Sequence, residues 1–302
     1  MRHFVAVAEE CHFGRAAARL NMAQPPLSQS IQRLEAELGV SLLDRSRRAV
    51  ELTTAGQVFL KEARRTLLQA ELARTLACRA AVKVPELRIS FIGPALYRVL
   101  TGMLLRFREE QPGIEVRLFE HPSPDQITGM MKGQFDIGIV SSGAARSEDF
   151  ESIVVERTKF FAIVPADGPL ADRTHISLTE LARHPFILPP NSQRVHASDL
   201  MVLFKNEGVM PHVVQEATQT NTTISLVAAG LGCSLVSSTA MLTAPKNVRF
   251  IPLEPGPVTV YRDLAMIWLP YHLNEHGTAF IAMAKSYVAD KPHLLDPDAP
   301  MT

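Results

Sequence analysis

The N-terminal part of this 302-residue chain is decided by the stretch AAARLNMAQPPLSQSIQRLE, residues 16–35. The pattern predicts two short amphipathic helices that meet at Asn21-Met22. Small side chains at Ala17 and Ala18 would let the two helices cross closely. Pro25 and Pro26 fit the first turn of the second helix, where no intrahelical hydrogen-bond donor is lost.

The second helix separates an apolar stripe from a polar face. Ile31, Leu34 and Leu38 supply the stripe at helical spacing. The residues left to face outward are Gln24, Ser28, Gln29, Gln32 and Arg33. Amide, hydroxyl and guanidinium groups on one helix can read base edges in a DNA major groove, so a helix-turn-helix is predicted. The simpler alternative is an ordinary helical hairpin with a solvated polar face.

The sequence that follows favours DNA binding over the hairpin alternative. Gly39 is placed to end the second helix. Residues 42–52 fit a small β-wing with Arg45, Arg47 and Arg48 at its tip, where guanidinium groups can meet phosphates or a minor groove. A long helix then starts near Thr53.

These segments resemble the LysR-type transcriptional regulators, and the resemblance extends over nearly the whole chain. It is carried by the segments 4–17, 24–28 and 45–53. The later segments look most like the branch that answers to muconates and other aromatic-catabolism acids. The resemblance implies a DNA-binding set made of Gln24, Pro25, Pro26, Ser28, Gln29, Gln32, Arg33, Arg45, Arg47, Arg48 and Thr53. It also implies double-stranded operator DNA, RNA polymerase and a homodimer that assembles into a homotetramer as partners.

Charge and composition agree with a DNA-binding head on a separate sensor. The net charge is zero, but residues 1–80 hold 12 Lys/Arg against 8 Asp/Glu, and the remainder holds 19 against 23. No apolar run reaches the roughly 18 residues of a membrane span. No signal peptide is predicted, and the three cysteines match no zinc spacing, so a cytoplasmic protein with no membrane partner and no metal or cofactor is expected.

The predicted organisation has five parts. Residues 1–53 form the winged helix-turn-helix, 54–80 a linker helix, 81–86 a hinge, 87–290 the effector-binding domain and 291–302 a disordered tail. The linker carries a heptad seam of mostly small residues and a second apolar surface, which favours a dimerisation helix over one buried within its own domain.

Strand and helix patterns alternate from Leu87 onward and predict an α/β sheet. With the family resemblance they imply a two-lobed, periplasmic-binding-protein-like sensor. Lobe I covers about residues 87–157 and 264–290, and lobe II about 158–263, with a strand beginning near Thr158.

Ligands in such sheets bind where strands end and helices begin. Four such junctions, together with the residue after the third strand, predict an effector site. Its residues are Gly93, Pro94, Ala95, Ser123, Ser141, Arg194, Val195, His196, Gln219 and Asn221. Ser123 followed by Gln126 also has the pattern of a helix capping box. Arg194 could pair with a carboxylate or be a solvated loop residue, and the predicted effector is a small organic acid, aromatic-derived or dicarboxylic.

Two alternatives are considered, one from another class of protein and one that keeps the DNA-binding head. An enzyme or solute-binding protein on a periplasmic-binding-like fold is one, but the sequence shows no paired-carboxylate, nucleophile-elbow, phosphate-loop or metal-ligand motif. A redox-sensing regulator is the other. It would depend on Cys233, which stands in an apolar run with no second cysteine in the sensor domain.

Overall fold

The computed structural model describes residues 1–44, 50–81, 85–145, 149–190, 194–255 and 261–299, with only the backbone described at 80 and 194–199. The chain divides into two units. The first holds Met1–Val82 and Met131–Gly133, and the second holds Lys83–Met130 and Gln134–Thr302. Among the described residues, no helix combines the length and apolarity needed to cross a lipid bilayer.

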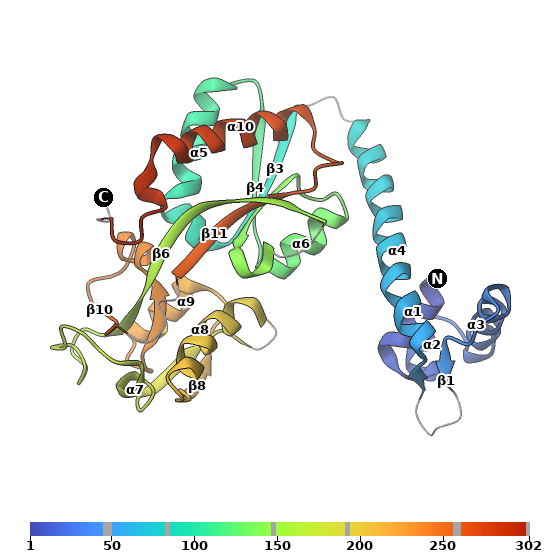
Figure 1. Cartoon of the computed structure of the whole chain (residues 1–302), viewed down its shortest axis with the longest axis horizontal. Helices are drawn as coiled ribbons and strands as arrows, with labels where there is room; N and C mark the ends of the chain where they lie inside the picture. The colour runs from blue at the N-terminus through green and yellow to red at the C-terminus, as the bar shows by residue number, and fades with distance from the viewer. Residues whose placement is uncertain (45–49, 82–84, 146–148, 191–193, 256–260, 300–302) are drawn as a thin grey trace. The chain divides into compact units, whose positions relative to one another are not determined.

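The first unit is a small helical domain followed by one long helix (Figure 1). Its elements are α1 (Arg2–Glu10), α2 (Phe13–Arg19), α3 (Gln24–Leu38), β1 (Leu43–Asp44), β2 (Glu51–Leu52) and α4 (Thr54–Ala80). Phe4, Leu27 and Ile31 are fully buried at its centre. The Phe4 ring meets Phe59 edge to face at 5.2 Å, which ties α1 to the start of α4.

The second unit is built on a seven-stranded mixed sheet with the order β10-β6-β11-β5-β3-β4 and with β9 paired to β6. The strands of this sheet are β3 (Glu86–Phe91), β4 (Glu115–Glu120), β5 (Ile137–Ser141), β6 (Glu151–Pro165), β9 (Ser234–Ser237), β10 (Val248–Pro252) and β11 (Tyr261–Trp268). A separate parallel pair is formed by β7 (Pro185–Leu188) and β8 (His212–Glu216). Strand β3 is parallel to β4 and β5, as expected of strand-helix alternation, whereas β11 runs antiparallel to β5 and β6.

The helices of the second unit connect and cover these strands. They are α5 (Val99–Glu110), α6 (Ser123–Met131), α7 (Leu178–Leu181), α8 (Arg194–Asn206), α9 (Thr220–Ala228) and α10 (Glu275–Asp290), with 3₁₀ turns η1 (Gly93–Tyr97), η2 (Ser142–Ala145), η4 (Ser238–Leu242) and η5 (Pro292–Leu294).

The second unit contains two lobes joined by two long strands. We call the part around β3, β4, β5, α5, α6 and α10 lobe I, and the part around β7, β8, β9, β10, α8 and α9 lobe II. Strands β6 and β11 run from one lobe into the other (Figure 1). The sequence predicted a strand beginning near Thr158, but β6 begins at Glu151. Its first residues pair with β11 over Trp268↔Glu151 and onward, and this pairing is what makes them a strand.

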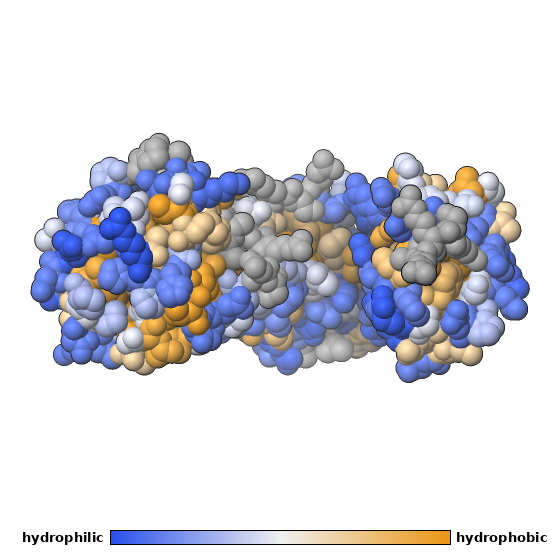
Figure 2. Space-filling model, turned by 90° about the horizontal axis from the view of Figure 1, so that it is seen from below, coloured by the Kyte–Doolittle hydropathy of each residue, from blue (hydrophilic) through white to orange (hydrophobic). Residues whose placement is uncertain are grey.

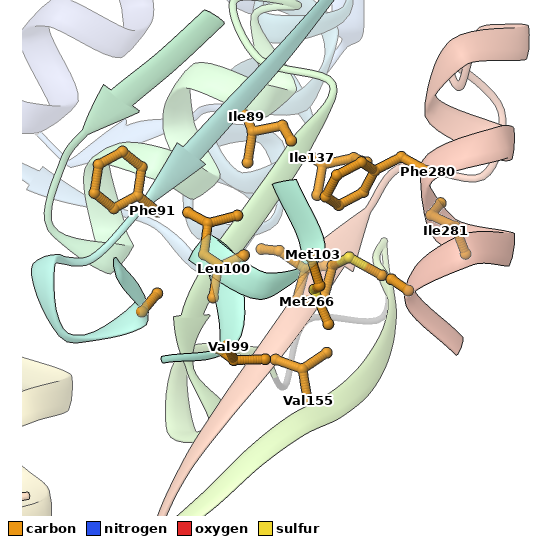
Figure 3. Packing of buried hydrophobic residues seen from close by; sticks show 14 of the residues in the cluster. Ile89, Phe91, Val99, Leu100, Met103, Ile137, Val155, Met266, Phe280 and Ile281 are labelled. Carbon is orange, nitrogen blue, oxygen red and sulfur yellow. The ribbon is translucent and has the colours of Figure 1, made fainter. Parts of the chain in front are cut away.

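The apolar core of lobe I joins its sheet to α5 and α10. Ile89, Ile137 and Met266 from three strands lie against Phe280 of α10 and Met103 of α5, all fully buried (Figure 3). Lobe II has separate cores, one of which is centred on Phe186 and Phe204, whose rings meet at 5.1 Å. Each lobe can therefore keep its own packing if the junction between them changes.

The end of the second unit departs from the expectation at one point. The disordered tail predicted from Lys291 is not found over Pro292–Leu294, because Leu294 is 1% exposed and belongs to the lobe I core.

In the view of Figure 2 an apolar patch lies over α8 and β8, where Val202, Val213 and Val214 are 44%, 41% and 46% exposed.

Candidate functional sites

The turn between α2 and α3 forms where the sequence predicted it. Asn21 has a φ of 52°, a left-handed conformation that asparagine tolerates better than most residues. Ala16 and Ala17 are buried at 0% and 3%, so the close helix approach exists. The predicted register was one residue late, because Ala18 is exposed.

Helix α2 has an N-cap that sequence reasoning missed. His12 Nδ1 accepts hydrogen bonds from the backbone N–H groups of Gly14 and Arg15 at 3.0 and 3.2 Å. Histidine is rarely counted as a capping residue, so the sequence offered little signal for this role.

The polar face of α3 is available to a partner. Gln24, Pro25, Pro26, Gln29, Gln32 and Arg33 are exposed, and Ser28 is half-buried. Gly39 ends the helix with a φ of 70°. The predicted stripe is correct at Ile31 but wrong at Leu38, which is 42% exposed because it stands in the last turn, beyond the core packing.

The wing exists as the short antiparallel pair β1–β2, while its predicted contact residues Arg45, Arg47 and Arg48 lie outside the described residues. Glu35 of α3 holds the base of the wing. Its Oε1 atom accepts from the backbone N–H groups of Leu42 and Leu43 at 2.8 and 3.0 Å. This carboxylate was not among the predicted site residues, although it fixes the wing against α3.

Thr53, predicted to bind DNA, has a structural role for its hydroxyl. The Oγ1 atom donates to the Ser41 carbonyl at 2.7 Å and accepts from the Gly56 N–H at 2.9 Å, which caps α4. Gly56 needs to be glycine because a Cβ there would lie 2.0 Å from the Leu42 carbonyl oxygen.

Part of the basic charge of the first unit is compensated within it. Glu9 accepts from Arg19 at 2.8 Å and from Arg64 at 2.7 Å, which joins α1, α2 and α4. Its partial burial would raise the pKa of Glu9, but the hydrogen bonds and charges of Arg64 and Arg19 outweigh burial and lower this pKa. Arg15 likewise pairs with Glu10 at 3.5 Å, whereas Arg33 stands exposed on α3.

The second candidate site is a cavity of about 50 Å³ where the lobes meet. Lobe I contributes the ends of β3, β4 and β5, and lobe II contributes the start of α9. Lining residues are Ile92, Gly93, Pro94, Glu120, His121, Pro122, Ser123, Pro124, Ser141, Thr218, Gln219, Thr220 and Arg262. Five predicted effector residues, Gly93, Pro94, Ser123, Ser141 and Gln219, therefore lie together.

Ser123 is the best-positioned hydroxyl in this cavity. It is 7% exposed, and its Oγ accepts the backbone N–H of Ser141 at 3.2 Å. Because that bond uses an oxygen lone pair, the hydroxyl hydrogen can still be donated. The predicted capping box is wrong. Gln126 Nε2 donates instead to the His121 and Ile139 carbonyls at 2.9 and 3.1 Å. These bonds hold the loop before α6 against β5.

Arg262 of β11 brings a buried cation to the same cavity and was not among the predicted residues. It is 5% exposed and lines both the cavity and a smaller adjoining pocket. Near it, Arg98 Nε donates to the buried Glu156 carboxylate at 2.7 Å. Burial raises the pKa of Glu156, opposed by the hydrogen bond and charge of Arg98 and by the charge of Arg262. Two guanidinium groups thus surround one carboxylate, an arrangement that favours an additional anion.

Other predicted effector residues lie elsewhere. Ala95 is fully buried and does not line the cavity. Asn221 accepts a hydrogen bond from the Tyr97 hydroxyl at 2.7 Å, which links η1 to α9. Arg194, Val195 and His196 begin α8, but their side chains lie outside the described part of the chain.

Cys233 lacks the properties of a redox sensor. It is 2% exposed, and burial raises the pKa of its thiol to about 12. The reactive species in thiol chemistry is the thiolate, which such an environment disfavours. Cys11 and Cys78 are exposed and lie in the first unit.

The comparisons with known proteins identify the family. Residues 1–57 match the model for bacterial regulatory helix-turn-helix proteins of the lysR family, and residues 81–289 match the LysR substrate binding domain. The uncharacterized HTH-type transcriptional regulator YnfL of Escherichia coli is 36% identical, over 90% of this chain and 92% of its own length. AlsR of Bacillus subtilis is 37% identical, over 80% of each chain. The structure of full-length CbnR with its target DNA is 26% identical with a TM-score of 0.57, over 94% of this chain and 97% of CbnR.

The chain therefore belongs to the LysR family of DNA-binding transcriptional regulators and is not an enzyme. Its helix-turn-helix, long α4 and α/β effector-binding domain are the parts expected from the sequence. Similarity to differently named regulators establishes the family and not a branch within it.

Proposed function

We propose that this regulator works in the cytoplasm and changes its DNA complex when a small organic acid binds in the cavity between lobes I and II. The observation that carries the proposal is the buried Arg262, which lines the same cavity as Ser123. Charged hydrogen bonds of this kind favour a carboxylate. Closure of the lobes around the acid would act on the DNA complex through the β6–β11 junction.

The size of the cavity favours a small acid. About 50 Å³ is well below the several hundred Å³ typical of sites for larger ligands. The resemblance to the muconate branch favours an aromatic-derived or dicarboxylic acid, which would require the lobes to move apart. A titration panel with both small and aromatic acids distinguishes these two sizes.

The test is calorimetry of the full-length protein with this panel. Ser123→Ala should weaken binding by about 0.5–1.5 kcal/mol, the net value of one hydrogen bond, and Arg262→Gln by about 2 kcal/mol. Matched controls are Ser286→Ala on α10 and Arg106→Gln on α5, which should leave the affinity for the acid unchanged. An acid that binds all four variants as tightly as wild type would place the site elsewhere.

The DNA part of the proposal assigns base reading to α3. Gln29 is exposed on this helix, and its amide can make a paired contact with adenine. Gln29→Ala should weaken the binding free energy on the preferred operator by about 1–3 kcal/mol and relax the sequence preference at one base pair. Gln69→Ala, on the exposed surface of α4, is the control. Equal losses on preferred and random duplexes in Gln29→Ala would contradict base reading.

Assembly is proposed to use α4, in a dimer that pairs into a tetramer. The predicted heptad seam consists of Phe59, Ala63, Thr66, Ala70, Ala73 and Ala77. The last four are exposed along this helix and would allow close approach of a second helix. Ala70→Glu should lower the oligomeric state in light scattering, while Gln69→Glu, one residue away, should not. Unchanged assembly in Ala70→Glu would mean that α4 packs only within its own chain and does not form the dimer.

A regulator of this kind is also expected to contact RNA polymerase.

A further inference from the structure

The cavity between the lobes contains hydrogen-bond acceptors as well as the cationic group. Glu120 ends β4 and Gln219 precedes α9, and both line the cavity. A Cβ added to Gly93 would lie 2.9 Å from Glu120 Oε1 and 4.0 Å from Gln219 Oε1. A carboxylate oxygen from lobe I and an amide oxygen from lobe II therefore converge on the one lining position that has no side chain.

The anion-binding groups of the cavity come from other residues. They are the Ser123 hydroxyl, the buried Arg262 guanidinium and the backbone N–H of Thr220, which as the first residue of α9 has no acceptor within its own helix. An acid bound to these groups stands in the same small cavity as Glu120. A second carboxylate on the ligand would face the Glu120 carboxylate, and like charges at close range repel.

We propose that the acid is a small monocarboxylate that also carries an ammonium group as hydrogen-bond donor, as in an amino acid. The donor binds Glu120 and Gln219 beside Gly93, and the carboxylate binds Ser123 and Arg262. This assignment rests on the function proposed above and narrows its ligand class. Gly93 is needed here because a side chain would occupy the donor's place against Glu120.

Four three-carbon acids test the assignment on the full-length protein: L-alanine, L-lactate, propionate and malonate. Beside the common carboxylate, L-alanine carries an ammonium group, L-lactate a hydroxyl and malonate a second carboxylate, while propionate carries no further polar group. Calorimetry should give the order alanine, lactate, propionate, malonate from tightest to weakest. Lactate binding more tightly than alanine would contradict an ammonium donor.

The variant that isolates the donor site is Glu120→Gln. It should weaken the binding of alanine roughly tenfold, because a charged hydrogen bond is lost, and leave the affinity for propionate within about twofold of wild type. The binding of malonate should become tighter, because a repulsion between two carboxylates is removed. Glu115→Gln, at the other end of β4, is the matched control and should change none of the four. Gly93→Ala should abolish the preference for alanine over propionate while the melting temperature stays unchanged.

The outcomes separate this inference from the function beneath it. Equal affinity for alanine and propionate, or no binding of the four acids, overturns the donor assignment. So does a Glu120→Gln effect that is the same for both acids. If propionate or malonate still binds and loses affinity in Arg262→Gln, the organic-acid function stands without the donor. If no acid in the wider panel responds to Arg262→Gln, the proposed function itself falls.

Discussion

The hydrogen bonds by which Glu35 of α3 holds the wing, here called the Glu35 brace, give the sharpest prediction for the first unit. Glu35 Oε1 accepts two backbone N–H groups, those of Leu42 and Leu43, and these residues are 1% and 4% exposed. A buried donor that loses its partner costs about 1–3 kcal/mol. Two such donors set an upper range of about 2–6 kcal/mol, and water entering beside the half-buried Glu35 reduces it, so Glu35→Ala should cost about 2–4 kcal/mol of local stability.

Hydrogen exchange of the backbone amides measures this cost at the site. A loss of about 2–4 kcal/mol corresponds to roughly 30- to 1000-fold faster exchange of the Leu42 and Leu43 amides. Glu35→Gln keeps an acceptor oxygen and should lie near wild type. Glu37→Ala, exposed on the same helix, is the matched control. Unchanged exchange of the two amides in Glu35→Ala would refute the brace.

Three further predictions concern the His12 cap, the ion pairs of Glu9 and the reactivity of the cysteine thiols. His12→Ala should lower the stability of the first unit by about 1 kcal/mol in thermal melts because α2 loses its N-cap, and His12→Asn should restore most of it. Arg64 and Arg19 hold the pKa of Glu9 below its ordinary value against the effect of burial, so the stabilisation from these ion pairs is present above the ordinary pKa and is lost as pH falls through the lower folded pKa. Melts between about pH 5 and 3 should therefore decline more steeply for wild type than for Glu9→Gln, and parallel curves would contradict the ion-pair role. Iodoacetamide should label exposed Cys11 and Cys78 but spare native Cys233, whose thiol has a pKa raised to about 12 by burial; equal labelling of all three thiols would disprove this.

Local patterns made the first unit predictable. Prolines in a helix start, a left-handed turn at Asn21 and a terminal Gly39 act on their own neighbours, so sequence alone locates α2 and α3. Glu35 and His12 were missed because their partners are backbone amides, which look alike in every sequence.

The cavity was predictable only in part, for a similar reason. Ser123 and Gly93 were found because they stand where strands end and helices begin. Arg262 lies inside a strand, and nothing near it in sequence signals burial, which is set by the packing of β11 against β6. The first half of β6 was missed because its charged residues resemble a loop, although Glu156 is buried with Arg98.

The central claim is that a small acid in the cavity controls the DNA complex. The direct measurement is a nuclease footprint of the full-length protein on a duplex selected from random sequence, with and without saturating L-alanine, in wild type and in Arg262→Gln. The account predicts that the acid changes the footprint of wild type only, while both proteins protect the same DNA without it. An acid-dependent change of equal size in Arg262→Gln, or none in wild type with the acid bound, would contradict the account.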